Sequence, residues 1–72
     1  LMSKFALILI LCSMNTNVCL PPYEVPKQYP DIYECFIDGY NYSLDKMRKL
    51  GKEEVNKHKL YIRFICKEEM VI

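Results

Sequence analysis

The 72-residue sequence has little net charge, two glycines and one histidine, and each shortage excludes a class of function. A formal net charge of +1 provides no field that would attract a nucleic acid. Gly39 and Gly51 are too far apart for a glycine-rich phosphate loop. His58 stands between Lys57 and Lys59, which is typical of a solvated face, and no nucleophile has a base at a recognisable spacing. We therefore expect neither a nucleic-acid partner nor an enzyme.

Residues 1–19 are predominantly apolar and have the order of a secretory signal peptide. Lys4 is their only charge, and a run of apolar side chains follows it over residues 5–14. A membrane-spanning helix needs about 20 apolar residues, and the polar residues 15–17 interrupt the run before that length. We predict a signal peptide that is removed after Cys19, an extracellular protein, and no stable membrane span. A buried N-terminal helix is the alternative.

Residues 20–30 contain all four prolines of the sequence. Proline fixes φ and lacks an N–H donor, so this stretch cannot form a regular helix. We predict an extended Pro-rich arm, with a polyproline ligand for a partner domain as the alternative.

Residues 31–72 are predicted to form a small helical domain. Asp31, with a glutamate three residues later, is a helix N-cap, and Gly39 is placed to end that helix. Ser43 is the N-cap candidate of a second short helix, which Gly51 ends.

A third helical stretch is predicted over residues 52–70. Within it, residues 60–66 are rich in β-branched and aromatic side chains and could instead form a buried strand. A strand must pair with another strand, and no other stretch of the sequence has a pattern typical of one. The expected fold class is therefore all-α, with two or three short helices after the arm.

The four cysteines divide between the leader and the remaining chain. Cys12 and Cys19 fall within the predicted signal peptide. Cys35 and Cys66 remain, and an exported pair is expected to form one disulfide. Closing a loop of about 30 residues contributes roughly 3–4 kcal/mol in the chain-entropy model. Two cysteines and His58 provide three ligands without CxxC spacing, so we expect no metal and no cofactor.

Three surface features have more than one interpretation. Asn41 begins an Asn-Tyr-Ser glycosylation sequon, which predicts a surface turn. The six tyrosines either cover the core or form a recognition surface. A basic cluster indicates a solvated helix face, with membrane headgroups or nucleic acid as the alternative contact. Its members are Lys46, Arg48, Lys49 and Lys52.

Cys35, Ile62 and Cys66 have the spacing Cys-x26-Ile-x3-Cys. In this spacing, residues 35–72 resemble the N-terminal half of insect odorant-binding proteins of the pheromone-binding type. Cys35 and Cys66 match that family's first and third cysteines, which pair with each other, and Ile62 stands where the second would be. Residues 59–72 look like the family's third helix. The resemblance implies an all-helical secreted carrier of small apolar molecules.

The chain departs from this family because the family's C-terminal half is missing. A leucine also precedes Met2, which indicates an incomplete or mis-started translation. We expect either a truncated carrier or an unrelated small secreted peptide.

The leading functional prediction is a secreted protein that binds a small hydrophobic ligand. The alternative is a secreted effector of the venom, salivary or reproductive-fluid type that acts on a partner protein or a membrane. Three short helices can hardly enclose a pocket of about 300 Å³, so the carrier would need to form a homodimer or to include further sequence. The apolar faces predicted to line the pocket comprise Ile32, Phe36, Met47, Leu50, Leu60, Phe64 and Ile65.

Overall fold

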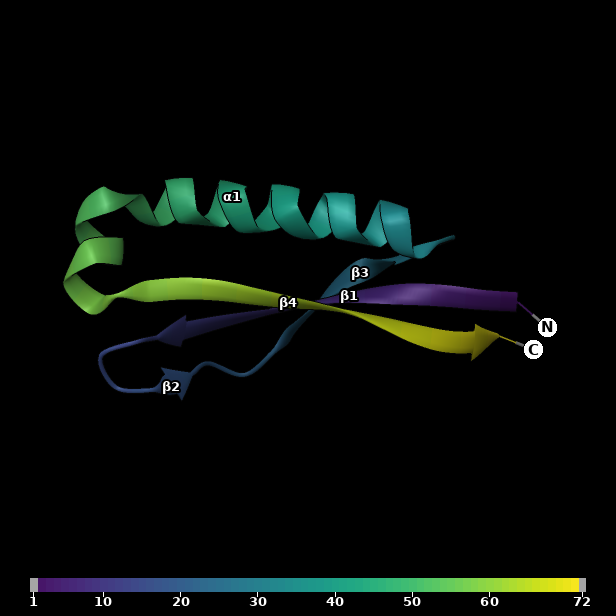
Figure 1. Ribbon diagram of the computed structural model, residues 1–72, viewed down its shortest axis with the longest axis horizontal. Helices are drawn as coiled ribbons and strands as arrows, with labels where there is room; N and C mark the ends of the chain where they lie inside the picture. The colour runs from purple at the N-terminus through teal and green to yellow at the C-terminus, as the bar shows by residue number, and fades with distance from the viewer. Residues whose placement is uncertain (1, 72) are drawn as a thin grey trace.

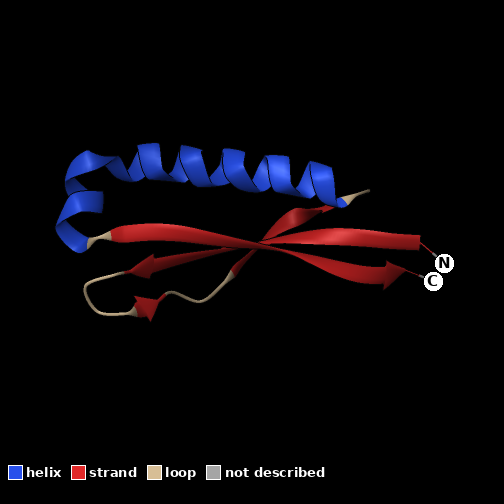
Figure 2. Cartoon of the chain, viewed as in Figure 1, coloured by secondary structure: helices blue, strands red, loops and turns tan. Residues whose placement is uncertain are grey.

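A computed structural model describes residues 2–71, and it contains one antiparallel sheet with one long helix on a single face (Figure 1). The all-α prediction is wrong, because strands make up nearly half of the chain (Figure 2). The elements in chain order are β1 (Met2–Ser13), β2 (Val18–Cys19), β3 (Tyr23–Tyr29), α1 (Ile32–His58) and β4 (Leu60–Val71).

β1 is the central strand of the sheet. It pairs along its whole length with β4, and its other edge pairs with β3 and then with the short β2. A short continuous apolar run is typical of a buried strand, and it is also typical of the core of a signal peptide. The same segment is therefore consistent with two different fates.

The third helix predicted over residues 52–70 continues only to His58. From Leu60 the chain is a strand, because β1 provides the partner that no stretch of the sequence indicates. Leu7 lies opposite Cys66, and Ile8 lies opposite Ile65, in a register that continues from Met2 to Ser13. α1 ends at His58, where Lys59 adopts a left-handed conformation with φ of 52°. The chain then turns back along β1 as β4.

α1 begins where the sequence predicts, and of the two predicted divisions, at Gly39 and at Gly51, it has only the second. The Asp31 carboxylate accepts a 2.8 Å hydrogen bond from the Glu34 N–H, which confirms the N-cap. Gly39 does not end the helix, and the Ser43 hydroxyl donates to the Gly39 carbonyl at 2.7 Å within it. Gly51, with φ of 87° and ψ of 157°, has a non-helical backbone and separates two helical segments of α1 that meet at a kink, which confirms the predicted helix end at this residue. A left-handed φ is tolerated there because glycine has no Cβ.

β3 gives the Pro-rich arm its extended conformation and places it within the sheet. Between Ala6 and Ile8 the β1–β3 register is irregular, and residues 25–27 lie opposite the single intervening residue Leu7. Pro26 lies in this bulge, where the regular hydrogen bonds between the strands are interrupted, so its lack of an N–H donor does not weaken the pairing.

The core lies between α1 and the facing side of the sheet. Leu7, Val25, Tyr29 and Cys35 are buried, each at most 2% exposed. Phe64 packs beside them, with Phe36 and Tyr40 edge-on to its ring at centroid distances of 6.3 and 4.9 Å. Gly39 lies beneath this ring, and a Cβ there would collide with Phe64.

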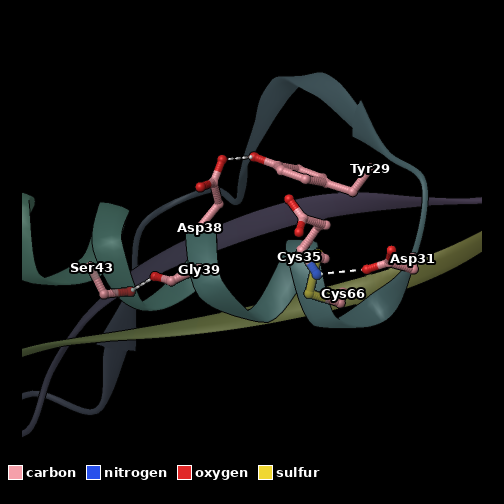
Figure 3. Close-up of a disulfide and its surroundings, with 8 residues drawn as sticks. Tyr29, Asp31, Cys35, Asp38, Gly39, Ser43 and Cys66 are labelled. Carbon is pink, nitrogen blue, oxygen red and sulfur yellow. Dashed lines mark hydrogen bonds between the residues drawn. A yellow bond between two sulfur atoms is a disulfide. The ribbon is translucent and has the colours of Figure 1, made fainter.

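Two disulfides fix the layers, so the expectation of a single bridge is wrong. Cys35–Cys66 joins α1 to β4 and spans 31 residues (Figure 3). Cys12–Cys19 joins β1 to β2 and spans 7 residues. The sequence does not indicate the second bridge, because Cys12 and Cys19 fall within the predicted signal peptide, whereas in the structure they lie opposite each other in the β1–β2 register.

Candidate functional site

A cleft of about 480 Å³ opens between α1 and the end of the sheet that carries β2. Its floor is apolar and comes from β1 and β4. The segment from β2 to β3 forms one wall, and α1 forms the other. The lining residues are Leu9, Leu11, Leu20, Pro21, Tyr23, Tyr42, Asp45, Lys46, Lys49 and Ile62.

The alternation of each strand explains how the floor forms. Leu9 and Leu11 project from β1 on the same face as the buried Leu7, because successive side chains alternate across a strand. Ile62 lies opposite Leu11 in β4 and extends the floor. α1 covers the Leu7 end of this face but leaves the Leu11 end open as the cleft.

The charges of the cleft lie on its α1 wall. Lys49 Nζ is 3.0 Å from an Asp45 carboxylate oxygen, and both side chains are largely exposed. Lys46 contacts the cleft and has no carboxylate within 4 Å among the residues that the structure describes. An ammonium group beside an apolar floor suits a ligand with an apolar body and an anionic end.

The seven residues predicted to line a pocket do not line this cleft and do not share one surface. Phe36 and Phe64 pack on each other. Ile65 lies on the opposite face of β4 from Phe64 and is exposed. Leu50 borders a second hollow of about 380 Å³ near the Gly51 kink. The other three, Ile32, Met47 and Leu60, are not among the residues that line either hollow.

Sequence reasoning missed the cleft for two identifiable reasons. Leu9 and Leu11 lie in the apolar run that predicts a signal peptide, so the sequence does not place them in the core. Lys46 and Lys49 belong to the basic cluster, whose pattern predicts a solvated helix face. Their spacing of three residues, with Tyr42 four residues before Lys46, places all three on one side of a helix and was the available signal.

Tyr29 and Asp38 form a polar contact that fastens β3 to α1 (Figure 3). The Tyr29 hydroxyl donates a 2.8 Å hydrogen bond to Asp38 Oδ2, and Lys27 Nζ lies 3.4 Å from the same oxygen. Burial of the ring raises the pKa of the Tyr29 phenol above its usual range, and the hydrogen bond and negative charge of Asp38 raise it further.

This contact predicts a loss of stability in alkali. An unfolded tyrosine loses its proton near pH 10, whereas folded Tyr29 retains it at higher pH. The stability contribution is therefore complete below about pH 10 and falls above it, by up to about 1.4 kcal/mol per pH unit. Tyr29→Phe is expected to lose about 1 kcal/mol at pH 7 and to remove this part of the alkaline slope.

Urea unfolding of the wild type and of Tyr29→Phe, from neutral pH to about pH 11, measures the effect. Tyr33→Phe is the matched control, because Tyr33 is 68% exposed. A difference in stability between wild type and Tyr29→Phe that stays constant across this range would contradict the assignment.

Asn41, the glycosylation candidate, is exposed but lies within α1. The surface turn predicted around it is wrong, because the helix continues through the sequon. Whether Asn41 is modified stays a prediction.

Across residues 2–71, no three metal-ligating side chains gather into a cluster. In the part of the chain that the structure describes, no helix is both long enough and apolar enough to span a membrane. The two disulfides are compatible with an extracellular protein. No known protein family, curated protein or solved structure matches this chain.

Proposed function

We propose that this protein is an extracellular carrier of small hydrophobic molecules that have an anionic end. The observation that supports this proposal is the cleft of about 480 Å³ with its apolar floor and the Lys46 ammonium at its edge. Cavities that hold small molecules typically start at about 300 Å³. One copy of the chain therefore contains enough space for a ligand.

The sheet removes the difficulty that an all-helical chain would have faced. Three short helices have no broad surface on which to build a pocket, whereas β1 and β4 provide a flat floor and α1 provides a wall. The resemblance to odorant-binding proteins does not support the proposal, since it implied an all-helical pocket lined by other residues.

The cleft also favours a carrier over an effector that acts on a partner. An effector needs an exposed recognition surface and no cavity, whereas a carrier needs a concave site that removes most of its ligand from water. Exposed side chains of Leu20 and Tyr23 at the cleft wall give such a site an open entrance.

Fluorescence of a dansyl-labelled undecanoic acid tests the proposal. We expect its emission to rise on binding, decanoic acid to displace it, and decanol to displace it more weakly. Changing Lys46 and Lys49 together to glutamine is expected to weaken the binding of decanoic acid by about tenfold, because a charge-assisted contact is lost. The binding of decanol should stay unchanged.

Leu20→Gln separates binding in the cleft from adsorption to the surface. Leu20 lines the cleft and is 57% exposed. Its replacement should therefore weaken the binding of the acid and of the alcohol equally, without unfolding the chain. Val18→Gln is the matched control, because Val18 is 59% exposed and outside the cleft. The proposal is refuted if the wild type, Leu20→Gln and Val18→Gln bind the probe equally. It is also refuted if the wild type binds no probe at about 100 µM, a concentration at which even weak micromolar ligands bind.

A further inference from the structure

β4 has a neighbour on only one of its edges within residues 2–71. It pairs with β1 from Leu60 to Val71, and no described strand lies beyond it. An unpaired strand edge presents a row of free backbone donors and acceptors that can pair with another chain. Twelve residues at about 3.3 Å each make this edge about 40 Å long.

The phase of the ladder shows which backbone groups point outward. The Met14 N–H donates to the Lys59 carbonyl at 2.8 Å, so this pair is a hydrogen-bonded one. Hydrogen-bonded pairs alternate along antiparallel strands. The odd-numbered residues of β4 therefore bond to β1, and its even-numbered residues, such as Cys66 and Glu68, direct their N–H and C=O groups away from it.

An apolar stripe of α1 lies on the same side of the molecule as this edge. Phe36 and Tyr40 lean on Phe64 of β4, and three further side chains continue the stripe at helical spacing. All five helix residues are between 43% and 68% exposed. A contiguous exposed stripe of this kind marks an interaction surface. We call it the α1 flank, and it comprises Tyr33, Phe36, Ile37, Tyr40 and Leu44.

We propose that two copies of this chain associate through β4, edge to edge and antiparallel, to form a continuous eight-stranded sheet. The two-fold axis of such a dimer is perpendicular to the sheet, so both helices lie on the same face. Helices that pack side by side are about 8–10 Å apart. Each α1 flank then contacts the other copy's flank, and apolar side chains are removed from water together.

The charges of β4 select a second copy and fix its register. Two registers overlap the strand almost completely, one with Cys66 opposite itself and one with Ile65 opposite itself. In the first, Arg63 lies opposite Glu69 of the other copy, twice by symmetry. In the second, Arg63 lies opposite Lys67. Opposite charges across a pair stabilise it and like charges destabilise it, so the first register is favoured.

The remaining contacts agree with the first register. Glu69 lies opposite Lys4 of its own β1, so each Glu69 would stand between two basic residues. Ile62 lies opposite Met70 of the other copy, an apolar pair on the face that carries α1. In both registers the outward-pointing even-numbered residues lie opposite one another, so the backbone hydrogen bonds can form in either and the side chains decide between them.

Sedimentation velocity of the full chain at about 100 µM tests whether the dimer forms. At this concentration a dimer with a micromolar Kd is largely associated. We expect twice the chain mass for the wild type. Arg63→Glu places two glutamates opposite each other and is expected to raise the dissociation constant at least tenfold. Adding Glu69→Arg to that variant reverses both charges and is expected to restore the dimer. Lys57→Glu makes the same charge change away from β4 and should leave the mass unchanged.

Glu68→Pro tests the strand edge itself. Its N–H points away from β1, so proline removes a bond to the second copy and none within the monomer. We expect a monomer with an unchanged circular dichroism spectrum and both disulfides formed. The proposal is overturned by a wild-type monomer at this concentration, including one that co-purifies with a different protein. It is also overturned if the charge exchange fails to restore the dimer, or if Glu68→Pro remains dimeric.

Discussion

A chain that begins at Leu20 is expected not to adopt this fold. Removal of residues 1–19 deletes β1, the only strand that pairs with β3 and β4 among the described residues. It also removes the fully buried Leu7 and the floor of the cleft. Loss of a single buried leucine costs about 2–5 kcal/mol, and a domain of this size has only a few kcal/mol of net stability.

Far-ultraviolet circular dichroism and urea unfolding of the full chain and of residues 20–72 measure this effect. We expect a cooperative transition for the full chain and none for the shorter one. The full-length variant with Cys12 and Cys19 changed to serine is the control, because it loses that disulfide but retains β1. Similar spectra and similar unfolding midpoints for the two lengths would contradict a central role for β1.

The role of β1 in the fold also bears on the predicted signal peptide. Residues 2–13 cannot both be removed on export and form the middle of the sheet. The intact mass of the exported protein distinguishes the two outcomes, since cleavage after Cys19 removes both cysteines of the Cys12–Cys19 disulfide and the whole of β1. If export removes these residues, the exported chain has a different structure and the cleft is lost.

Loss of the Cys35–Cys66 disulfide is expected to be the second large effect. Replacing both cysteines by alanine frees a loop of 31 residues and is predicted to cost about 4 kcal/mol in the chain-entropy model. Cys35 is fully buried beside Leu7, so the replacement also loosens the core. We expect a largely unfolded chain at 37 °C.

The matched control is the pair of alanines at Cys12 and Cys19. This bridge spans only 7 residues, and the same model gives about 2.5 kcal/mol for it. Urea midpoints of the two double variants should therefore differ by about 1 kcal/mol or more in unfolding free energy. An equal loss for both, or a greater loss for the short loop, would contradict this ranking.

The sequence could predict the local features of this fold and not its pairing. The Asp31 cap, the extended arm and the positive φ at Gly51 each depend on a few neighbouring residues, so composition and order were enough to indicate them. The predicted helix end at Gly39 is wrong because a glycine permits a helix to end but does not require it. Here its missing Cβ makes room for the ring of Phe64.

The candidate site was less predictable than the fold. Its floor combines Leu9 and Leu11 with Ile62, residues that are about fifty positions apart in the chain. Such a juxtaposition depends on the register of β1 and β4. Only the α1 wall, with Tyr42, Lys46 and Lys49 at helical spacing, was visible as a local pattern.

The helix start, the extended arm and the small net charge follow from the order of the residues alone. That residues 60–71 form a strand, that residues 2–13 pair with it and that all four cysteines form disulfides depends on how distant segments come together. The physical reason is that a strand is stabilised by hydrogen bonds to another strand. An apolar run that is ambiguous when taken alone becomes a strand once a complementary edge lies beside it.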